Sequence, residues 1–184
     1  IQNFAEEKGL QYPVDFASAG SSQIGGNIAT NAGGIKVLRY GLTRDWIQGL
    51  TVVTGRGDVL ELNKGLIKNA TGYDLRHLFI GSEGTLGFIA KATIQLAAAP
   101  VKPEVLLLSV DNMTDVIKVL VEFRSQLNLI AFEFFSELAL QHVLKERSAN
   151  HPFEAATQYY VLLEFENGTP EAMESAMASF ENCL

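Results

Sequence analysis

The sequence predicts an α+β protein made of two parts that meet at a short proline-containing segment. Three observations point to this arrangement. The segment Ala97–Pro103 carries two prolines within four positions, which neither a helix nor a central strand accommodates. Before it, apolar residues alternate as in strands, and a glycine-rich stretch interrupts them; after it, strand-like and helix-like patterns alternate. We therefore expect residues 1–99 and 100–184 to form separate domains.

Composition fits an ordinary globular protein. Of the 184 residues, 47% are hydrophobic and 19% are charged, enough for one generous domain or two small ones. The net charge of −7, without a basic run, argues against nucleic acid as a partner. No apolar run approaches the roughly 20 residues of a membrane-spanning helix.

The single cysteine, Cys183, cannot form an internal disulfide, which fits a reducing compartment, and we expect a cytoplasmic protein. Because the sequence opens on Ile1 and not on Met, we expect a piece of a longer protein.

The sequence of the first part, residues 1–99, predicts a short helix ending at Gly9 and a β-hairpin. Alternation over Ile47–Val53 indicates a strand, Gly55–Asp58 is a turn signal, and Val59–Leu62 is the returning strand. The Arg-Gly-Asp triplet inside that turn is interpreted as turn chemistry and not as an adhesion motif.

Two further elements follow the hairpin. Asp74 is placed to cap a short helix that ends near Gly81, and His77 in the same turn is interpreted as structural. From Leu86 to Leu96 the residues alternate as in a half-buried strand. One face of this strand is expected to carry Leu86, Phe88, Ala90, Ala92, Ile94 and Leu96.

The second part predicts three strands, each followed by a helix. The strands are Glu104–Val110, Ala131–Phe135 and Gln158–Glu166. Asn112 (with Asp115) and Ser136 are expected to cap the first two helices, and Pro170 begins the third. The first helix carries Val116, Val119, Leu120, Phe123 and Leu127 on its apolar face, the second Leu140, Val143 and Leu144, and the third Met173, Ala176, Met177 and Phe180. With antiparallel pairing, this order predicts a ferredoxin-like half, to which a fourth strand would be added next.

The stretch Gly20–Gly34, GSSQIGGNIATNAGG, is the main candidate for a binding site. Five glycines with small polar residues leave backbone N–H groups with little side-chain cover. A flexible linker has a similar composition, but Ile24 and Ile28 recur at helical spacing, so Gly25–Gly26 is expected to open a short packed helix. The start of such a helix favours a phosphate or nucleotide ligand.

A second stretch, Gly81–Ile89, reads GSEGTLGFI, and Arg39–Gly41 and Thr71–Leu75 lie between the two. In this order and spacing, these segments resemble the FAD-binding domain of FAD-linked oxidases of the vanillyl-alcohol oxidase type. The likeness is to the D-lactate and D-2-hydroxyglutarate dehydrogenase branch. It covers about Ser18–Leu96 and continues more weakly through the residues that follow, which correspond to the family's substrate or cap domain.

The resemblance implies the second half of an FAD-binding domain in residues 1–99 and part of a ferredoxin-like substrate or cap domain in residues 100–184. It implies FAD, held non-covalently, with the first stretch along the diphosphate and ribityl chain and the second at the adenine end. Phe88 departs from the branched aliphatic residue usual in the family. The implied cofactor-binding residues are Gly20, Ser21, Ser22, Gly25, Gly26, Thr30, Asn31, Gly33, Glu83, Gly84, Thr85, Leu86, Gly87, Phe88 and Ile89.

The implied activity is oxidation of a D-2-hydroxy acid of the lactate, glycolate or 2-hydroxyglutarate type to the 2-oxo acid. The family's upstream diphosphate loop and downstream His-rich site have no counterpart here, and His77, His142 and His151 stand singly. We therefore assign no catalytic residue and no metal ligand. We expect this chain alone to be inactive, to hold FAD weakly or not at all, and to self-associate through sheet edges.

Two alternatives stay open. One is the flavin domain of another branch, such as the alkylglycerone-phosphate synthase type. The other is a non-enzymatic interaction module in which the glycine-rich stretches are merely structural.

Overall fold

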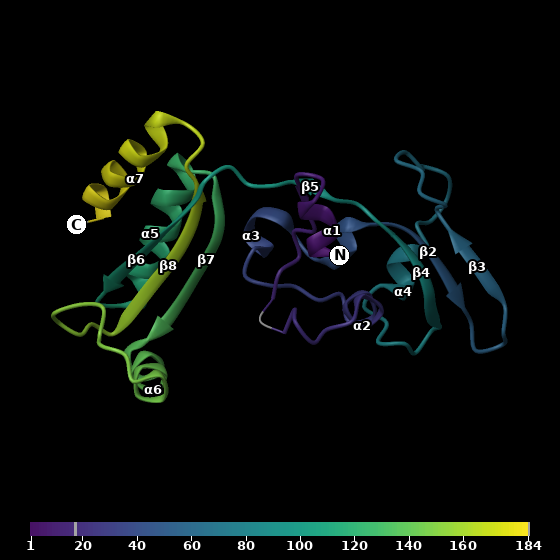
Figure 1. Cartoon of the computed structure of the whole chain (residues 1–184), viewed down its shortest axis with the longest axis horizontal. Helices are drawn as coiled ribbons and strands as arrows, with labels where there is room; N and C mark the ends of the chain where they lie inside the picture. The colour runs from purple at the N-terminus through teal and green to yellow at the C-terminus, as the bar shows by residue number, and fades with distance from the viewer. Residues whose placement is uncertain (17, 184) are drawn as a thin grey trace. The chain divides into compact units, whose positions relative to one another are not determined.

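The computed structural model describes residues 1–16 and 18–183, which divide into two compact units. The first unit is Ile1–Ala99 and the second is Pro100–Leu184. Each has its own sheets and its own buried hydrophobic cluster (Figure 1). They are described separately below.

The first unit is built on a three-stranded antiparallel sheet with the order β3-β2-β4. Its strands are β2 (Ile47–Val53), β3 (Val59–Leu62) and β4 (Phe88–Ile94). Leu50 pairs with Leu62 and Val53 with Val59, so the predicted hairpin is confirmed. The remaining elements are α1 (Gln2–Glu6), β1 (Leu10–Gln11), α2 (Ile24–Ala29), α3 (Val37–Tyr40), the 3₁₀ helix η1 (Thr43–Trp46), α4 (Arg76–Phe79) and β5 (Ala97–Ala98).

Strand β4 corrects the predicted alternation. Thr51 pairs with Lys91, but the next residue of β2, Val52, pairs with Ile89, so Ala90 is an extra residue in the ladder. This bulge moves the apolar face by one position. Ile89 packs against the core together with Ala92 and Ile94, whereas Phe88 is 73% exposed.

A small second sheet was not predicted. β1 pairs antiparallel with β5, with Leu10 opposite Ala98 and Gln11 opposite Ala97. The sequence interval between these partners is too long for any local pattern to reveal the pairing. The start of the chain is thereby tied to the end of the first unit.

The second unit alternates strands and helices as predicted. Its elements are β6 (Pro103–Val110), α5 (Met113–Gln126), β7 (Leu129–Ser136), α6 (Glu137–Arg147), β8 (Tyr159–Glu166) and α7 (Pro170–Cys183). The strand order is β6-β8-β7, with both pairs antiparallel. The predicted caps are confirmed, because Asn112 Oδ1 accepts from the N–H of Asp115 at 3.1 Å and Ser136 Oγ accepts from that of Ala139 at 3.3 Å.

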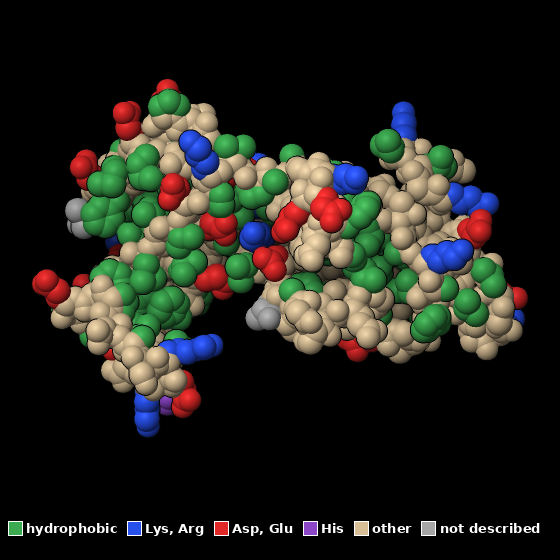
Figure 2. All heavy atoms as spheres, viewed as in Figure 1, with side chains coloured by type: hydrophobic (Ala, Val, Ile, Leu, Met, Phe, Trp, Pro, Cys, Tyr) green, Lys and Arg blue, Asp and Glu red, His purple; other side chains and the backbone are tan. Residues whose placement is uncertain are grey.

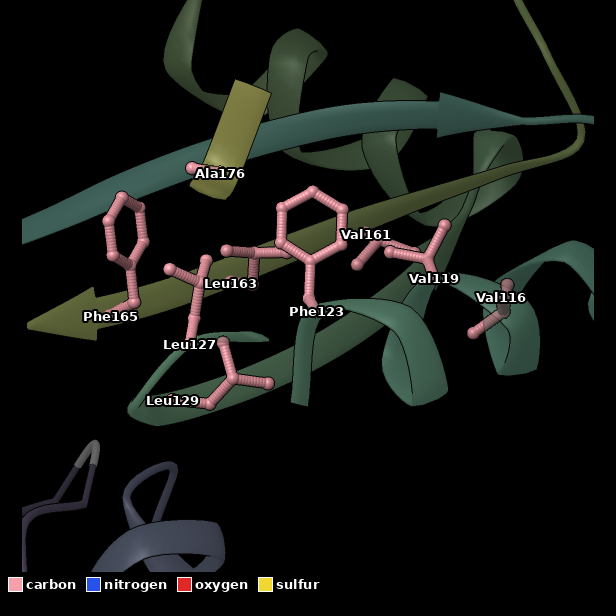
Figure 3. Packing of buried hydrophobic residues seen from close by; sticks show 9 residues of the cluster. All are labelled: Val116, Val119, Phe123, Leu127, Leu129, Val161, Leu163, Phe165 and Ala176. Atoms are coloured by element: carbon pink, nitrogen blue, oxygen red, sulfur yellow. The ribbon is translucent and has the colours of Figure 1, made fainter. Parts of the chain in front are cut away.

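The core of the second unit lies between this sheet and the helices α5 and α7 (Figure 3). As the predicted face requires, α5 buries Val116, Val119 and Phe123. β8 contributes alternate residues from the middle of the sheet, which is the period of a strand with one face on a core. The residues drawn are Val116, Val119, Phe123, Leu127, Leu129, Val161, Leu163, Phe165 and Ala176.

The predicted buried faces of the last two helices are partly wrong. In α7 only Ala176 and Ser179 are buried, while Met177 is 55% exposed. The buried face of α7, which packs against α5, is therefore made of small residues. Met173 and Phe180 are also exposed, as is Val143 in α6. Figure 2 shows hydrophobic and acidic side chains intermingled around α7.

Candidate functional site

The two glycine-rich segments, Gly20–Gly34 and Gly81–Ile89, are joined by backbone hydrogen bonds. The N–H of Gly81 donates to the carbonyl oxygen of Ile28 at 3.1 Å, and the N–H of Glu83 donates to that of Ala29 at 2.8 Å. Both acceptors lie at the carboxyl end of α2, whose Ile28 is completely buried. Residues more than 50 positions apart in the sequence are thereby paired, and the two segments lie side by side.

The glycines of the two segments fall into two groups. A Cβ atom added to Gly20, Gly25, Gly26 or Gly84 would meet no atom within 4 Å. At these positions the backbone is uncovered, as close approach of a ligand requires.

Other glycines are required by packing of the chain itself. A Cβ atom at Gly33 would lie 2.6 Å from Leu42 Cδ2, and one at Gly87 would lie 2.6 Å from Val52 Cγ1. Gly84 differs from the other uncovered positions, because its φ of +76° is one that side-chain-bearing residues rarely adopt.

The amino end of α2 offers backbone donors. Its N-cap residue, Gln23, makes no side-chain hydrogen bond to the helix. The first amides of a helix have no intrahelical acceptor, and here they include those of Gly25 and Gly26. This uncovered backbone suits an anionic ligand, so the residues present fit the phosphate groups of a dinucleotide.

The hydroxyl groups of the candidate residues donate to their own segments. Ser21 Oγ donates to Ser18 O at 3.3 Å, Thr30 Oγ1 to Gly26 O at 3.0 Å and Thr85 Oγ1 to Ser82 O at 2.6 Å. Ser22 Oγ donates to Ala19 O at 3.4 Å and accepts from Asn27 Nδ2. Backbone N–H groups are therefore the main donors left for an anion.

The end of the second segment offers main-chain contacts. Ile89 packs its side chain into the core, and Leu86 is 52% exposed. β4 is an outer strand of its sheet and pairs with β2 on one side. At Phe88 and Ile89, the main-chain groups that point away from β2 therefore lie outside the hydrogen-bonded ladder of the sheet.

A hollow of about 240 Å³ borders the first segment. Ser22, Ile24 and Asn27 line it, together with Tyr12 and Val14. A hollow of about 370 Å³ lies elsewhere, over Thr51, Glu61 and Lys91 on the strands of the same unit.

Asp74 lies one position before the N-cap of α4, whereas we predicted it to be the capping residue itself. The N-cap residue is Leu75, and Asp74 Oδ1 accepts from the backbone N–H of Arg76 at 3.2 Å. The hydrogen bond from the Arg76 side chain lowers the pKa of the Asp74 carboxyl below its usual value. Arg76 also donates to Ile47 O at 2.6 Å, and His77 lies 3.5 Å from Asp74. The cluster anchors α4 to β2.

Sequence reasoning missed Arg44. Its backbone N–H donates to Asn31 Oδ1 at 3.0 Å, and its guanidinium Nη2 donates to the carbonyl oxygen of Ile80 at 3.3 Å. No local pattern marks this residue, because Ile80 is 36 positions away. Of the candidate residues, Asn31 therefore has its side-chain oxygen engaged within the protein.

Across residues 1–16 and 18–183, no group of three or more His, Cys, Asp or Glu side chains could hold a metal ion. Nor does any helix of that part have the length and apolar character needed to cross a membrane.

Comparison with known families gives two matches. Residues 1–63 match the family described as "FAD binding domain", and residues 99–184 match "FAD linked oxidases, C-terminal domain".

Individual relatives agree with these matches. The chain is 59% identical over 184 residues to a D-2-hydroxyglutarate dehydrogenase of Stutzerimonas stutzeri (strain A1501), covering 100% of this chain and 40% of that protein. It is 39% identical over 147 residues to the glycolate oxidase subunit GlcD of Bacillus subtilis (strain 168), covering 73% of this chain and 31% of that protein. The chain thus spans about two fifths or less of the length of these curated relatives.

A solved structure of an alkyldihydroxyacetonephosphate synthase shares the fold. Its TM-score is 0.74 at 22% sequence identity, with 99% of this chain and 37% of that chain covered. The fold, the two family matches and the relatives agree. The chain belongs to the FAD-linked oxidases of the vanillyl-alcohol oxidase type.

Proposed function

We propose that this chain is part of an FAD-dependent dehydrogenase that oxidises a D-2-hydroxy acid to the 2-oxo acid. The observation that carries the proposal is the junction of the two glycine-rich segments, where Gly81 and Glu83 donate to Ile28 and Ala29. The names of the relatives, which refer to 2-hydroxyglutarate and glycolate, support a 2-hydroxy acid as substrate.

In this proposal the first segment lies along the diphosphate and ribityl chain of FAD and the second along its adenine end. The uncovered backbone at Gly25, Gly26 and Gly84 supports this assignment. The chemistry that FAD supplies when bound is acceptance of a hydride from the carbon that bears the hydroxyl group. Binding is non-covalent, and backbone N–H groups bear most of the phosphate contact.

The residues of the second unit belong, in this proposal, to the substrate domain, and the FAD-binding part is residues 1–99. We also propose a cytoplasmic location, supported by Cys183, a free cysteine. Cell fractionation with an antibody against the protein tests the location.

The test of function uses the purified whole protein that carries this chain. We expect flavin absorbance, release of the flavin into the supernatant on acid precipitation, and anaerobic bleaching by D-2-hydroxyglutarate, D-lactate or glycolate. L-2-hydroxyglutarate and L-lactate serve as matched controls and should leave the flavin oxidised.

Two results would contradict the proposal. A colourless protein that takes up no added FAD would remove the cofactor. A flavin that none of the three acids reduces would contradict oxidation of an acid of these types and favour another branch, such as the alkylglycerone-phosphate synthase type.

A further inference from the structure

Arg44 contacts both glycine-rich segments. Its backbone N–H donates to Asn31 Oδ1 in the first segment, and its side chain donates to Ile80 O, immediately before the second. The residue lies in η1, outside both segments. It is therefore a third element that holds the other two.

The junction beside Arg44 is closely packed. A Cβ atom added to Gly81 would lie 3.3 Å from Asn31 Cβ and 3.5 Å from Arg44 Nη2. Asn31 itself has a φ of 50°, a conformation that asparagine tolerates better than most residues. Its side-chain oxygen has the N–H of Arg44 as its partner, so the unusual backbone and the hydrogen bond act together.

The direct backbone bonds between the segments lie at the same place. Gly81 donates to Ile28 and Glu83 donates to Ala29. The two acceptors lie within three residues of Asn31, and the two donors lie within three residues of Ile80. A shift at Asn31 or Ile80 would therefore lengthen both bonds and change the spacing of the surface that the segments form.

We propose that Arg44 is a positioning residue for the FAD site. Through Asn31 and Ile80 it fixes the distance between the two glycine-rich segments before the cofactor binds. This inference rests on the proposed function. It assigns Arg44 no contact with FAD: the residue acts by pre-organising groups that make the contact.

The test compares Arg44→Met, Asn31→Gly and the double variant in the whole protein. Arg44→Met removes the bond to Ile80 but retains the backbone N–H, and Asn31→Gly removes the acceptor while glycine still adopts positive φ. FAD affinity is measured by fluorescence titration of flavin-free protein, and amide exchange of Gly81 and Glu83 is measured in the same preparations.

We expect each single variant to bind FAD about tenfold more weakly, or worse. We also expect faster exchange of the Gly81 and Glu83 amides in the absence of FAD. The double variant should lose less than the sum of the two single losses, since both changes act across one junction. Arg44→Lys, which retains a donor for Ile80, should recover part of the affinity.

Arg56→Met is the matched control. Arg56 lies in the turn between β2 and β3, where its backbone N–H bonds to Thr54, so we expect wild-type affinity and exchange.

The two proposals fail in different ways. Wild-type protein that binds no FAD would refute the proposed function. If the wild-type protein binds FAD but the amides of Gly81 and Glu83 exchange at the wild-type rate in both single variants, the positioning role is overturned. This holds even if the variants bind FAD more weakly.

Discussion

The hydroxyl group of Tyr160 donates a hydrogen bond to Glu137 Oε2 at 2.5 Å, joining β8 to the first residue of α6. Tyr160 is completely buried, and its ring stacks on Phe135 and Phe153 with centroid distances of 5.5 Å and 5.4 Å. His151 Nε2 lies 3.1 Å from the same hydroxyl oxygen. The hydrogen bond from Tyr160 is the main reason that the pKa of Glu137 is lowered.

Tyr160→Phe should destabilise the second unit, since it leaves Glu137 and the N–H of Thr157 without this partner. A carboxyl group whose pKa is lowered by folding stabilises the protein at pH values above its unfolded-state pKa of about 4.3. This contribution is lost as the pH falls through the lower pKa of the folded state. The variant should therefore lose less stability on acidification than wild type. Urea unfolding at several pH values measures both effects.

Tyr159→Phe is the control for this change, because Tyr159 is adjacent and only partly buried. An equal loss in both variants, or an unaltered acid dependence in Tyr160→Phe, would contradict the assigned role of the Tyr160 hydroxyl.

Gly26→Val should abolish flavin retention in the whole protein and change its thermal stability little. Outside the backbone of its own helix, a Cβ atom at Gly26 would meet no atom within 4 Å, so the added side chain would occupy space open to a ligand. Valine is not worse than glycine within a helix. Flavin content per protein and melting temperature are the measurements. Flavin content equal to that of wild type would refute the prediction.

The comparison variants are Gly84→Val and Gly87→Val. Gly84→Val should also lose flavin, but its positive φ adds strain. Gly87→Val should lower stability first, since the added carbon would meet Val52 at 2.6 Å.

Asn112→Ala should lower the stability of the second unit by about 1 kcal/mol, the usual effect of removing an N-cap side chain. Asn112 Oδ1 bonds to the N–H of Asp115 in the first turn of α5. Chemical denaturation measures the change, and Asn112→Asp should preserve most of the stability. Asn150→Ala, at an exposed site outside the helices, is the control; an equal effect there would show that the cap is not the cause.

The 184-residue chain by itself should bind FAD at least 100-fold more weakly than the whole protein. Binding energy for a long dinucleotide is spread over its length, and the family's upstream diphosphate loop has no counterpart in this chain. Each charge-assisted hydrogen bond that such a loop would make is worth about 1.5–3 kcal/mol. Fluorescence titration of both proteins tests this. Tight stoichiometric binding by the short chain would refute it.

The same chain should self-associate through β6, an outer strand of its sheet. Val105, on this strand, is 58% exposed, and an exposed apolar edge is a template for pairing with another chain. Val105→Lys should reduce association in light scattering, whereas Lys118→Glu on α5 should not. A strictly monomeric wild-type chain at high concentration would contradict the prediction.

Local signals were sufficient for most of the secondary structure. The caps at Asn112 and Ser136 were predictable because each bonds to a residue three positions away. The hairpin of β2 and β3 was predictable because its turn chemistry and alternation are contiguous in the sequence. The bulge at Ala90 was not, because it depends on how β4 pairs with β2.

The candidate site divides in the same way. Its glycine content is visible in the sequence, but only packing separates Gly26, which is uncovered, from Gly87, which is enclosed. The position of Asp74 one residue before the N-cap also depends on tertiary contacts, since Arg76 is held by Ile47 as well as by Asp74.

The sequence by itself determined the main strands, the starts of α5, α6 and α7, the two glycine-rich segments and the family resemblance, because these depend on neighbours within a few residues. Only the tertiary structure decided that Gly81 and Glu83 bond to α2, that Arg44 holds Asn31 and Ile80, and that α7 buries small residues. These contacts join residues distant in sequence. Their geometry is fixed by close packing around Ile28 and Ala176, which no periodic pattern records.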